Sequence, residues 1–211
     1  MRRVVVASAL VVAVAAGTST AGDRLPTPQS YGETCSLVGS WCGSSVPSGN
    51  IPATLRRRLH LPKVRQGAAC PRASGWRIDN DQFAGTALGR GPVTPLIAPP
   101  QGAGDVRHGI VPFRRSPGTK WWGVKTLWFS KPRYRGPVFI RGRRLDGTGS
   151  IVFGESPSLV DPQLPPGPTL NGTKGWRQWP GGTYIRSLGC YAWQVDGRNF
   201  SYVIAFKAVK A

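Results

Sequence analysis

The sequence predicts an all-β protein: an immunoglobulin-like antiparallel β-sandwich preceded by an irregular N-terminal arm. Three observations lead to this prediction. The 211 residues include 28 Gly and 20 Pro, which is typical of turn-rich β structure and not of a helical bundle. Short apolar runs recur about every ten residues with turn residues between them, as in antiparallel sandwiches. The hydrophobic content of 40%, with 8 Trp, is sufficient for a packed core.

The N-terminus has the pattern of a signal peptide. Arg2 and Arg3 precede an apolar run over residues 4–16, and Ser19-Thr20-Ala21 supplies small residues for cleavage. The apolar run is shorter than the roughly 20 residues that cross a bilayer. We therefore expect a secreted protein without a transmembrane span in the mature chain. The alternative is an uncleaved membrane anchor.

Composition divides the rest of the chain. Residues 22–50 are rich in Ser, Gly and Pro and show no apolar periodicity, which indicates a flexible arm. The next segment is basic and lies between Pro52 and Pro62, with Leu55 and Leu59 at i,i+4 spacing, so we predict a helix of at most two turns there. The predicted regions are a signal peptide (1–21), a flexible arm (22–50), a basic segment (51–69) and a β-sandwich domain (70–211).

Within the β-sandwich domain, the last two strands have the clearest pattern. Apolar and polar residues alternate over Cys190–Val195 and again over Phe200–Phe206, and Asp196-Gly197 lies between these runs. Such an arrangement predicts a β-hairpin. Weaker strand patterns cover residues 92–98, 109–113, 120–129, 136–142, 149–154 and 176–186.

All four cysteines follow the predicted cleavage site. An even number of cysteines in an oxidising compartment indicates disulfides, and four allow three pairings. We favour Cys35–Cys42 and Cys70–Cys190. The sequence has no CxxC pair and only two histidines, which argues against zinc. A blue-copper site normally has an axial Met, and Met1 leaves with the signal peptide. We predict no metal and no cofactor.

Six short strings stand out, at residues 55–62, 67–71, 134–138, 141–147, 176–180 and 189–197. They resemble motifs of a group of secreted actinobacterial β-rich proteins. The resemblance covers roughly residues 51–211 and implies a secreted β-rich domain, without implying a chemistry. It also suggests a high-GC Gram-positive source, in which codon composition favours Arg.

One motif suggests an enzyme. Ser187-Leu188-Gly189-Cys190 resembles the Ser-His-Gly-Cys signature of L,D-transpeptidases, which need a thiolate nucleophile and a nearby base. Leu188 stands where that family has histidine, and the Arg that follows the family's Cys is missing here. His108 lies 82 residues before Cys190, far from the family's spacing. We predict no catalytic residues, and a cell-wall enzyme using Cys190 is the alternative.

Other catalytic or ion sites have less support. The Gly-x-Ser-x-Gly nucleophile elbow is absent, although a triad through His60 or His108 stays open because triads assemble in space. Asp79 and Asp81 could hold calcium, but a short acidic turn is more often only a turn. A glycosidase needs two carboxylates across a cleft, and the chain has only nine acidic residues to choose from.

The chain is strongly basic. Removing Arg2 and Arg3 with the signal peptide lowers the formal charge from +19 to +17, since 26 − 9 = 17. This charge attracts anionic polymers such as teichoic or lipid phosphates and acidic glycans. The export signal and the absence of a nucleic-acid-binding motif argue against nucleic acid. We expect an anionic envelope polymer or a protein partner, and the alternative is that the basic side chains only solvate the sandwich.

Basic and aromatic residues alternate most densely in the middle of the chain, where adjacent Trp121 and Trp122 indicate that one indole points outward. Packing in the core is the alternative role for most tryptophans. The predicted anion-binding residues are Arg114, Arg115, Lys125, Arg133, Arg135, Arg141, Arg143 and Arg144.

Overall fold

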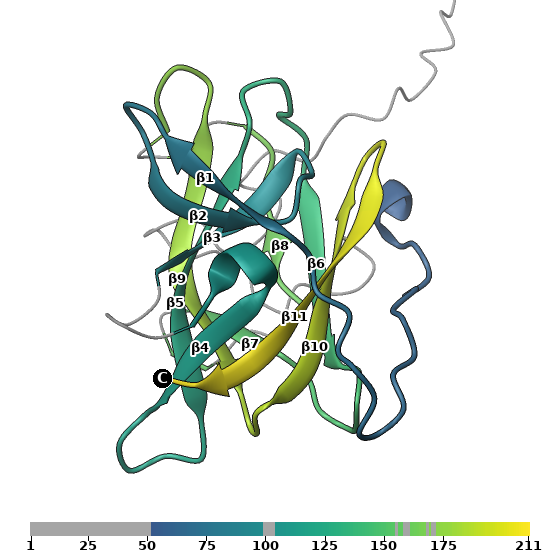
Figure 1. Cartoon of the computed structure of the whole chain (residues 1–211). Coiled ribbons are helices and arrows are strands. Elements are labelled where there is room, and N and C mark those ends of the chain that lie inside the picture. The colour runs from purple at the N-terminus through teal and green to yellow at the C-terminus, as the bar shows by residue number, and fades with distance from the viewer. Residues whose placement is uncertain (1–51, 99–103, 155, 158–160, 168, 170–171) are drawn as a thin grey trace, which may run out of the picture.

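The computed structural model describes residues 52–98, 104–154, 156–157, 161–167, 169 and 172–211. This part of the chain is all-β, which confirms the predicted class, and Figure 1 shows the arrangement of its strands. No helix among these residues is long and apolar enough to cross a membrane. The strands are β1 Gly75–Asp79, β2 Ala84–Leu88, β3 Val93–Ala98, β4 Ile110–Arg115, β5 Trp122–Ser130, β6 Val138–Arg144, β7 Val152–Gly154, β8 Gln163–Leu164, β9 Arg177–Ile185, β10 Gly189–Gly197 and β11 Ser201–Lys210.

The strands form one continuous sheet in the order β1-β2-β3-β5-β4-β11-β10-β6-β8. β5 also pairs with β9 along its whole length, and β9 pairs with β7. All pairs are antiparallel except β4 with β11. An isolated bridge between Arg143 and Ser150 brings the segment before β7 back beside β6. The sheet therefore curls around a shared interior (Figure 1).

The main core fills this interior with aromatic side chains. Trp128, Trp179 and Trp193 are fully buried, which agrees with the inward positions that their alternation indicates. The ring of Trp193 stacks on Phe206 with a centroid distance of 4.1 Å, and Trp128 meets Trp193 edge-on at 5.6 Å. Each such residue removes a large apolar area from water, so these rings supply much of the hydrophobic stabilisation.

A second, smaller apolar cluster lies on the outer face of β5. Val124 and Trp128 point into the main core, whereas Phe129 points the opposite way and packs against Phe83, Trp76 and Trp176. We call this cluster the minor core. It fastens the β1–β2 hairpin onto β5 and separates the two ends of the outer face of β5.

The structure contains the predicted Cys70–Cys190 disulfide, with a Cα–Cα distance of 5.5 Å. The bond ties the segment before β1 to the start of β10. Cys35 and Cys42, the predicted signal peptide and the predicted flexible arm lie outside the described residues.

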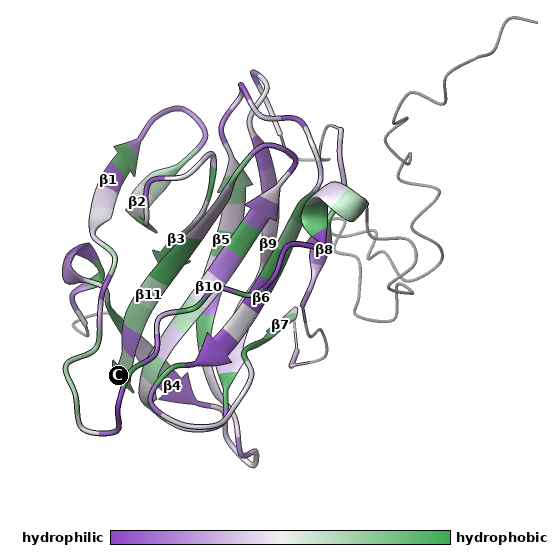
Figure 2. Ribbon diagram, turned by 90° about the vertical axis from the view of Figure 1, so that its right-hand side faces the viewer, coloured by the Kyte–Doolittle hydropathy of each residue, from purple (hydrophilic) through white to green (hydrophobic). Residues whose placement is uncertain are grey.

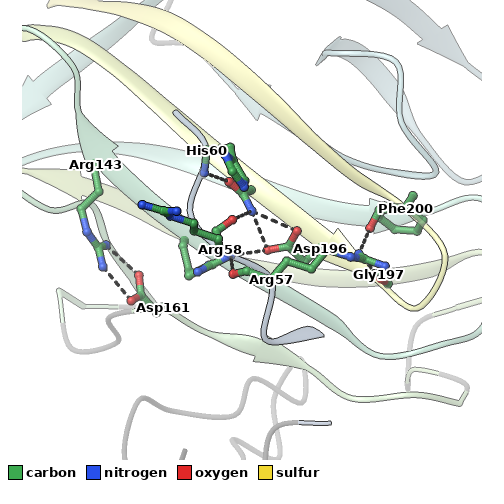
Figure 3. Close-up of polar contacts among 10 residues, drawn as sticks. Arg57, Arg58, His60, Arg143, Asp161, Asp196, Gly197 and Phe200 are labelled. Atoms are coloured by element: carbon green, nitrogen blue, oxygen red, sulfur yellow. Dashed lines mark hydrogen bonds and ion pairs between the residues drawn. The ribbon is translucent and has the colours of Figure 1, made fainter. Parts of the chain in front are cut away.

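The basic segment differs from its prediction. Only a 3-10 turn, η3 Ala53–Leu55, forms where a helix of up to two turns was expected, and residues 56–65 have no regular secondary structure. The reason is that its backbone bonds to β10 instead of to itself. Gln194 donates from Nε2 to the Arg58 carbonyl at 3.1 Å, and its Oε1 accepts from the His60 N–H at 2.7 Å (Figure 3).

Arg57 attaches the same segment to the β10–β11 hairpin. Its guanidinium donates to the carbonyls of Gly197 at 2.6 Å, of Arg198 at 2.8 Å and of Phe200. Leu55 is fully buried beside this attachment. The basic segment thus lies over Gln194 and Asp196 of β10. Figure 2 shows both polar segments (purple) and apolar segments (green) along the strands of the sheet.

Candidate anion-binding groove

A groove of about 500 Å³ lies on the outer face of β4, β5 and β9. Three of the predicted anion-binding residues, Arg114, Arg115 and Lys125, line it together. The other lining residues come from the β4–β5 turn and from β5 and β9: Ser116, Pro117, Gly123, Val124, Pro180, Gly181, Gly182 and Tyr184.

Strand register brings these side chains together. Arg114 pairs with Gly123, and Gly123 pairs with Tyr184, so three strands contribute to one row. Lys125 pairs with Gly182 two residues further along. Because positions two apart in a strand share a face, Arg114, Lys125 and Tyr184 project from the same side of the sheet. Arg115, the next residue of β4, also lines the groove.

Glycines shape the floor of the groove. A Cβ atom at Gly182 would lie 2.6 Å from the hydroxyl oxygen of Tyr184, and one at Gly123 would lie 2.9 Å from its ring. The phenol ring therefore lies flat across both glycines, which no larger residue would allow. The floor is an aromatic surface surrounded by cations.

The groove cations are exposed, and none of the described carboxylates neutralises them. All six described Asp side chains pair with other residues. The Arg115 guanidinium lies 5.6 Å from the centroid of the Trp122 ring. The six pairs are Asp79–Arg77, Asp81–Lys174, Asp105–His108, Asp146–Arg144, Asp161–Arg143 and Asp196–Arg141.

The structure does not bring the three β6 arginines of the predicted set to this groove. Arg141 donates to Asp196, and Arg143 donates both terminal nitrogens to Asp161 at 2.8 Å (Figure 3). The hydrogen bonds that Arg143 donates to Asp161 raise the pKa of Arg143 against the lowering effect of burial. The positive charges of these two arginines are therefore balanced by carboxylates of the same chain.

Arg144 is matched in the same way, by Asp146 at 2.7 Å and the Ser187 hydroxyl at 2.6 Å. Burial opposes ionisation of Asp146, but the bonds from Arg144 and from the Cys190 N–H outweigh it and lower its pKa. Arg133 and Arg135 are exposed in the β5–β6 loop and do not line the groove.

Sequence reasoning missed the aromatic part of the site. Tyr184 was not among the predicted residues, and the Pro180-Gly181-Gly182 run inside a strand was the only local sign of a close backbone approach. Of the adjacent tryptophans, Trp122 packs against the main core. Trp121 lies under the guanidinium of Arg186, whose central carbon is 3.8 Å from the centroid of the Trp121 ring.

The residues considered for catalysis or metal binding are placed apart. Cys190 is 1% exposed and bonded to Cys70. The His108 Nδ1 lies 2.5 Å from the Asp105 carboxylate on the surface, and this contact lowers the pKa of Asp105. Among the described residues, no three His, Cys, Asp or Glu side chains converge as metal ligands.

Comparison of the chain with protein families, curated proteins and solved structures finds no match. The resemblance to secreted actinobacterial proteins therefore stays a prediction.

Proposed function

We propose that this protein is a secreted, non-catalytic β-sandwich protein whose groove binds an anionic polymer of the cell envelope. The observation that carries the proposal is the meeting of Arg114, Arg115 and Lys125 around one groove, with no described carboxylate against them. An immunoglobulin-like arrangement of the core and cleavage after residue 21 are part of this proposal.

The chemistry of the groove suits a phosphate-rich chain. A guanidinium offers paired N–H donors that match phosphate oxygens, while the Lys125 ammonium acts as a point charge. The Tyr184 ring supplies a flat apolar surface for the carbon units between phosphates. Exposed ion pairs contribute only about 0–1 kcal/mol each in water. Useful affinity therefore requires several contacts along one polymer.

The test is salt-dependent retention of the full chain on immobilised teichoic acid. The groove variant is Arg114→Ala/Arg115→Ala/Lys125→Ala. The matched control, Lys63→Ala/Arg65→Ala/Arg72→Ala, removes the same charge from exposed positions outside the groove. We expect the control to elute close to the wild type and the groove variant to elute at much lower salt, because exposed charge contacts are screened.

Two results would overturn the proposal. Retention of the wild type that does not change with salt would exclude an electrostatic groove. Equal losses in the two variants would show that only net charge matters. Retention on vesicles of anionic lipid, measured in parallel, separates a lipid surface from a soluble polymer, and binding to an acidic protein partner alone would also count against the proposal.

The L,D-transpeptidase alternative needs a Cys190 thiolate. The Cys70–Cys190 disulfide holds that sulfur in a bond, and its side chain is buried. Alkylation of the native chain followed by peptide mapping tests the alternative. A thiol at Cys190 that reacts without reduction would support the enzyme, whereas an unlabelled Cys190 supports the non-catalytic proposal.

A further inference from the structure

A second basic pocket of about 340 Å³ lies near the opposite end of β5 from the groove. Trp76 of β1, Arg90 of the β2–β3 turn and Lys131, directly after β5, line it. None of these residues is in the predicted site. Neither cation pairs with any of the six described Asp side chains.

Two hydrogen bonds hold the pocket together by fastening its walls to one turn. The Trp76 indole Nε1 donates to the Gly89 carbonyl at 2.6 Å. The Lys131 N–H donates to the Pro92 carbonyl at 2.9 Å. Three segments of the chain therefore meet at the β2–β3 turn, and these bonds hold the Trp76 indole and the backbone of Lys131 there.

Two glycines allow the β2–β3 turn to pack closely against β11. Gly89 has a φ of +81° and lies against Ile204, and a Cβ atom at Gly91 would overlap the ring of Tyr202. The hydroxyl of Tyr202 donates to the Val93 carbonyl just after the turn. Arg90 is thus held between two anchored residues.

The pocket has the composition of a site for an anionic group. The Lys131 Nζ lies 5.2 Å from the centroid of the Trp76 ring, which packs edge-on against Phe129 of the minor core. Two converging cations attract an oxyanion, and the indole offers an apolar surface to the carbon atoms attached to it.

The pocket and the groove lie near opposite ends of the outer side of β5, with the minor core between them. Lys125, Leu127 and Phe129 alternate on the outer side of β5, and Lys131 continues this alternation. From Lys125 to Lys131 the distance along the strand is about 20 Å, at roughly 3.3 Å per residue. A small anion can occupy only one of these sites, whereas a chain long enough to pass over the minor core can occupy both.

We propose that Arg90 and Lys131, with the ring of Trp76, form a second anion-binding site, and that the ligand is a linear phosphate-rich polyanion that fills this site and the groove together. The inference rests on the proposed function for the role of the groove. Linking two weak sites through one chain raises the overall affinity without any new contact.

The experiment measures binding of inorganic tripolyphosphate and of long-chain inorganic polyphosphate by calorimetry. The proteins are the wild type, Arg90→Ala/Lys131→Ala, the groove variant, and Lys63→Ala/Arg65→Ala as a control with the same charge loss as the first variant. We expect each site variant to bind long chains at least about tenfold more weakly than the control. Tripolyphosphate should bind the wild type at two sites and each site variant at one.

The outcomes separate the two proposals. If Arg90→Ala/Lys131→Ala binds long chains as the control does, the second site is wrong and the groove stands. If only the groove variant keeps wild-type affinity, the groove is wrong and the second site stands. No binding of either probe to the wild type would overturn the second site. Urea unfolding midpoints equal to that of the wild type establish that each variant is folded.

Discussion

Arg141 and Asp196 form an ion pair across β6 and β10, with 2.6 Å between the guanidinium Nη2 and the carboxylate Oδ2. The Asp196 side chain is 0% exposed and that of Arg141 13%. The same guanidinium nitrogen donates to the Arg57 carbonyl at 2.7 Å, and Gln194 donates to the Asp196 carboxylate at 3.1 Å (Figure 3). This pair therefore holds the basic segment on the sheet.

Removing the buried carboxylate should destabilise the fold strongly. Asp196→Ala leaves Arg141 without its partner, and breaking a buried ion pair in this way costs about 3–5 kcal/mol. The free energy of unfolding in urea measures the loss. Asp81→Ala is the control, because its pair with Lys174 is exposed and should contribute less than about 1 kcal/mol. Similar losses in both variants would contradict the structural role of Asp196.

The Cys70–Cys190 disulfide should stabilise the fold through the long loop that it closes. The two residues are 120 positions apart, and the chain-entropy model assigns a loop of this size about 4–5 kcal/mol. We expect Cys70→Ala/Cys190→Ala to lose most of this free energy of unfolding. A reducing agent should then have little further effect on the variant. A large further loss on reduction would assign the stabilisation to the other cysteines.

Arg177 should be needed for the loop that follows β8. The residue is 1% exposed, and its guanidinium donates to the carbonyls of Pro165, Gly136 and Gly167 at 3.2, 2.9 and 3.3 Å. Arg177→Met leaves these buried acceptors without a donor, and each such loss costs about 1–3 kcal/mol. Chemical unfolding measures the effect, with exposed Arg133→Met as a control that should change stability by less than about 0.5 kcal/mol. Wild-type stability of Arg177→Met would refute this role.

Stability should fall at alkaline pH. Burial raises the pKa of Tyr202 above its ordinary value of 10.0, and it also raises the pKa of Tyr134 and Tyr191. A group with a higher pKa when folded contributes stability that is fully present below pH 10 and is lost as the pH rises further. Each tyrosine then contributes a slope of up to about 1.4 kcal/mol per pH unit.

Arg177 acts in the opposite direction over the same range. Burial lowers its pKa to about 10, so the cost of burying its charge is relieved as the pH rises above that value. The tyrosines outnumber it, and we expect a net loss of stability above pH 10. Urea midpoints measured between pH 8 and the alkaline limit test this, and Tyr202→Phe should give a shallower decline. An unchanged slope in that variant would assign the decline to other groups.

The all-β class and the β10–β11 hairpin could be predicted because their signals are local. The alternation on either side of Asp196-Gly197 indicates the hairpin without help from the rest of the chain. The expected Asp-Gly turn lies two residues too early, because Asp196 and Gly197 belong to β10 and the turn is made by Arg198 and Asn199. β1 and β2 were not predicted individually, since Gly75–Leu88 has little alternation. These strands are stabilised by β3 and by the minor core, which residues distant in sequence create.

The sequence by itself determined the number of basic residues and the β-rich framework that carries them. Only the tertiary structure decided which of the basic side chains form an ion pair with a carboxylate. It brings Asp196 to Arg141 across 55 positions and Asp161 to Arg143 across 18, while strand register gathers Arg114, Lys125 and Tyr184 around glycines. The physical reason is that charge pairing depends on distance in space, and in a sheet that distance is set by non-local hydrogen bonds.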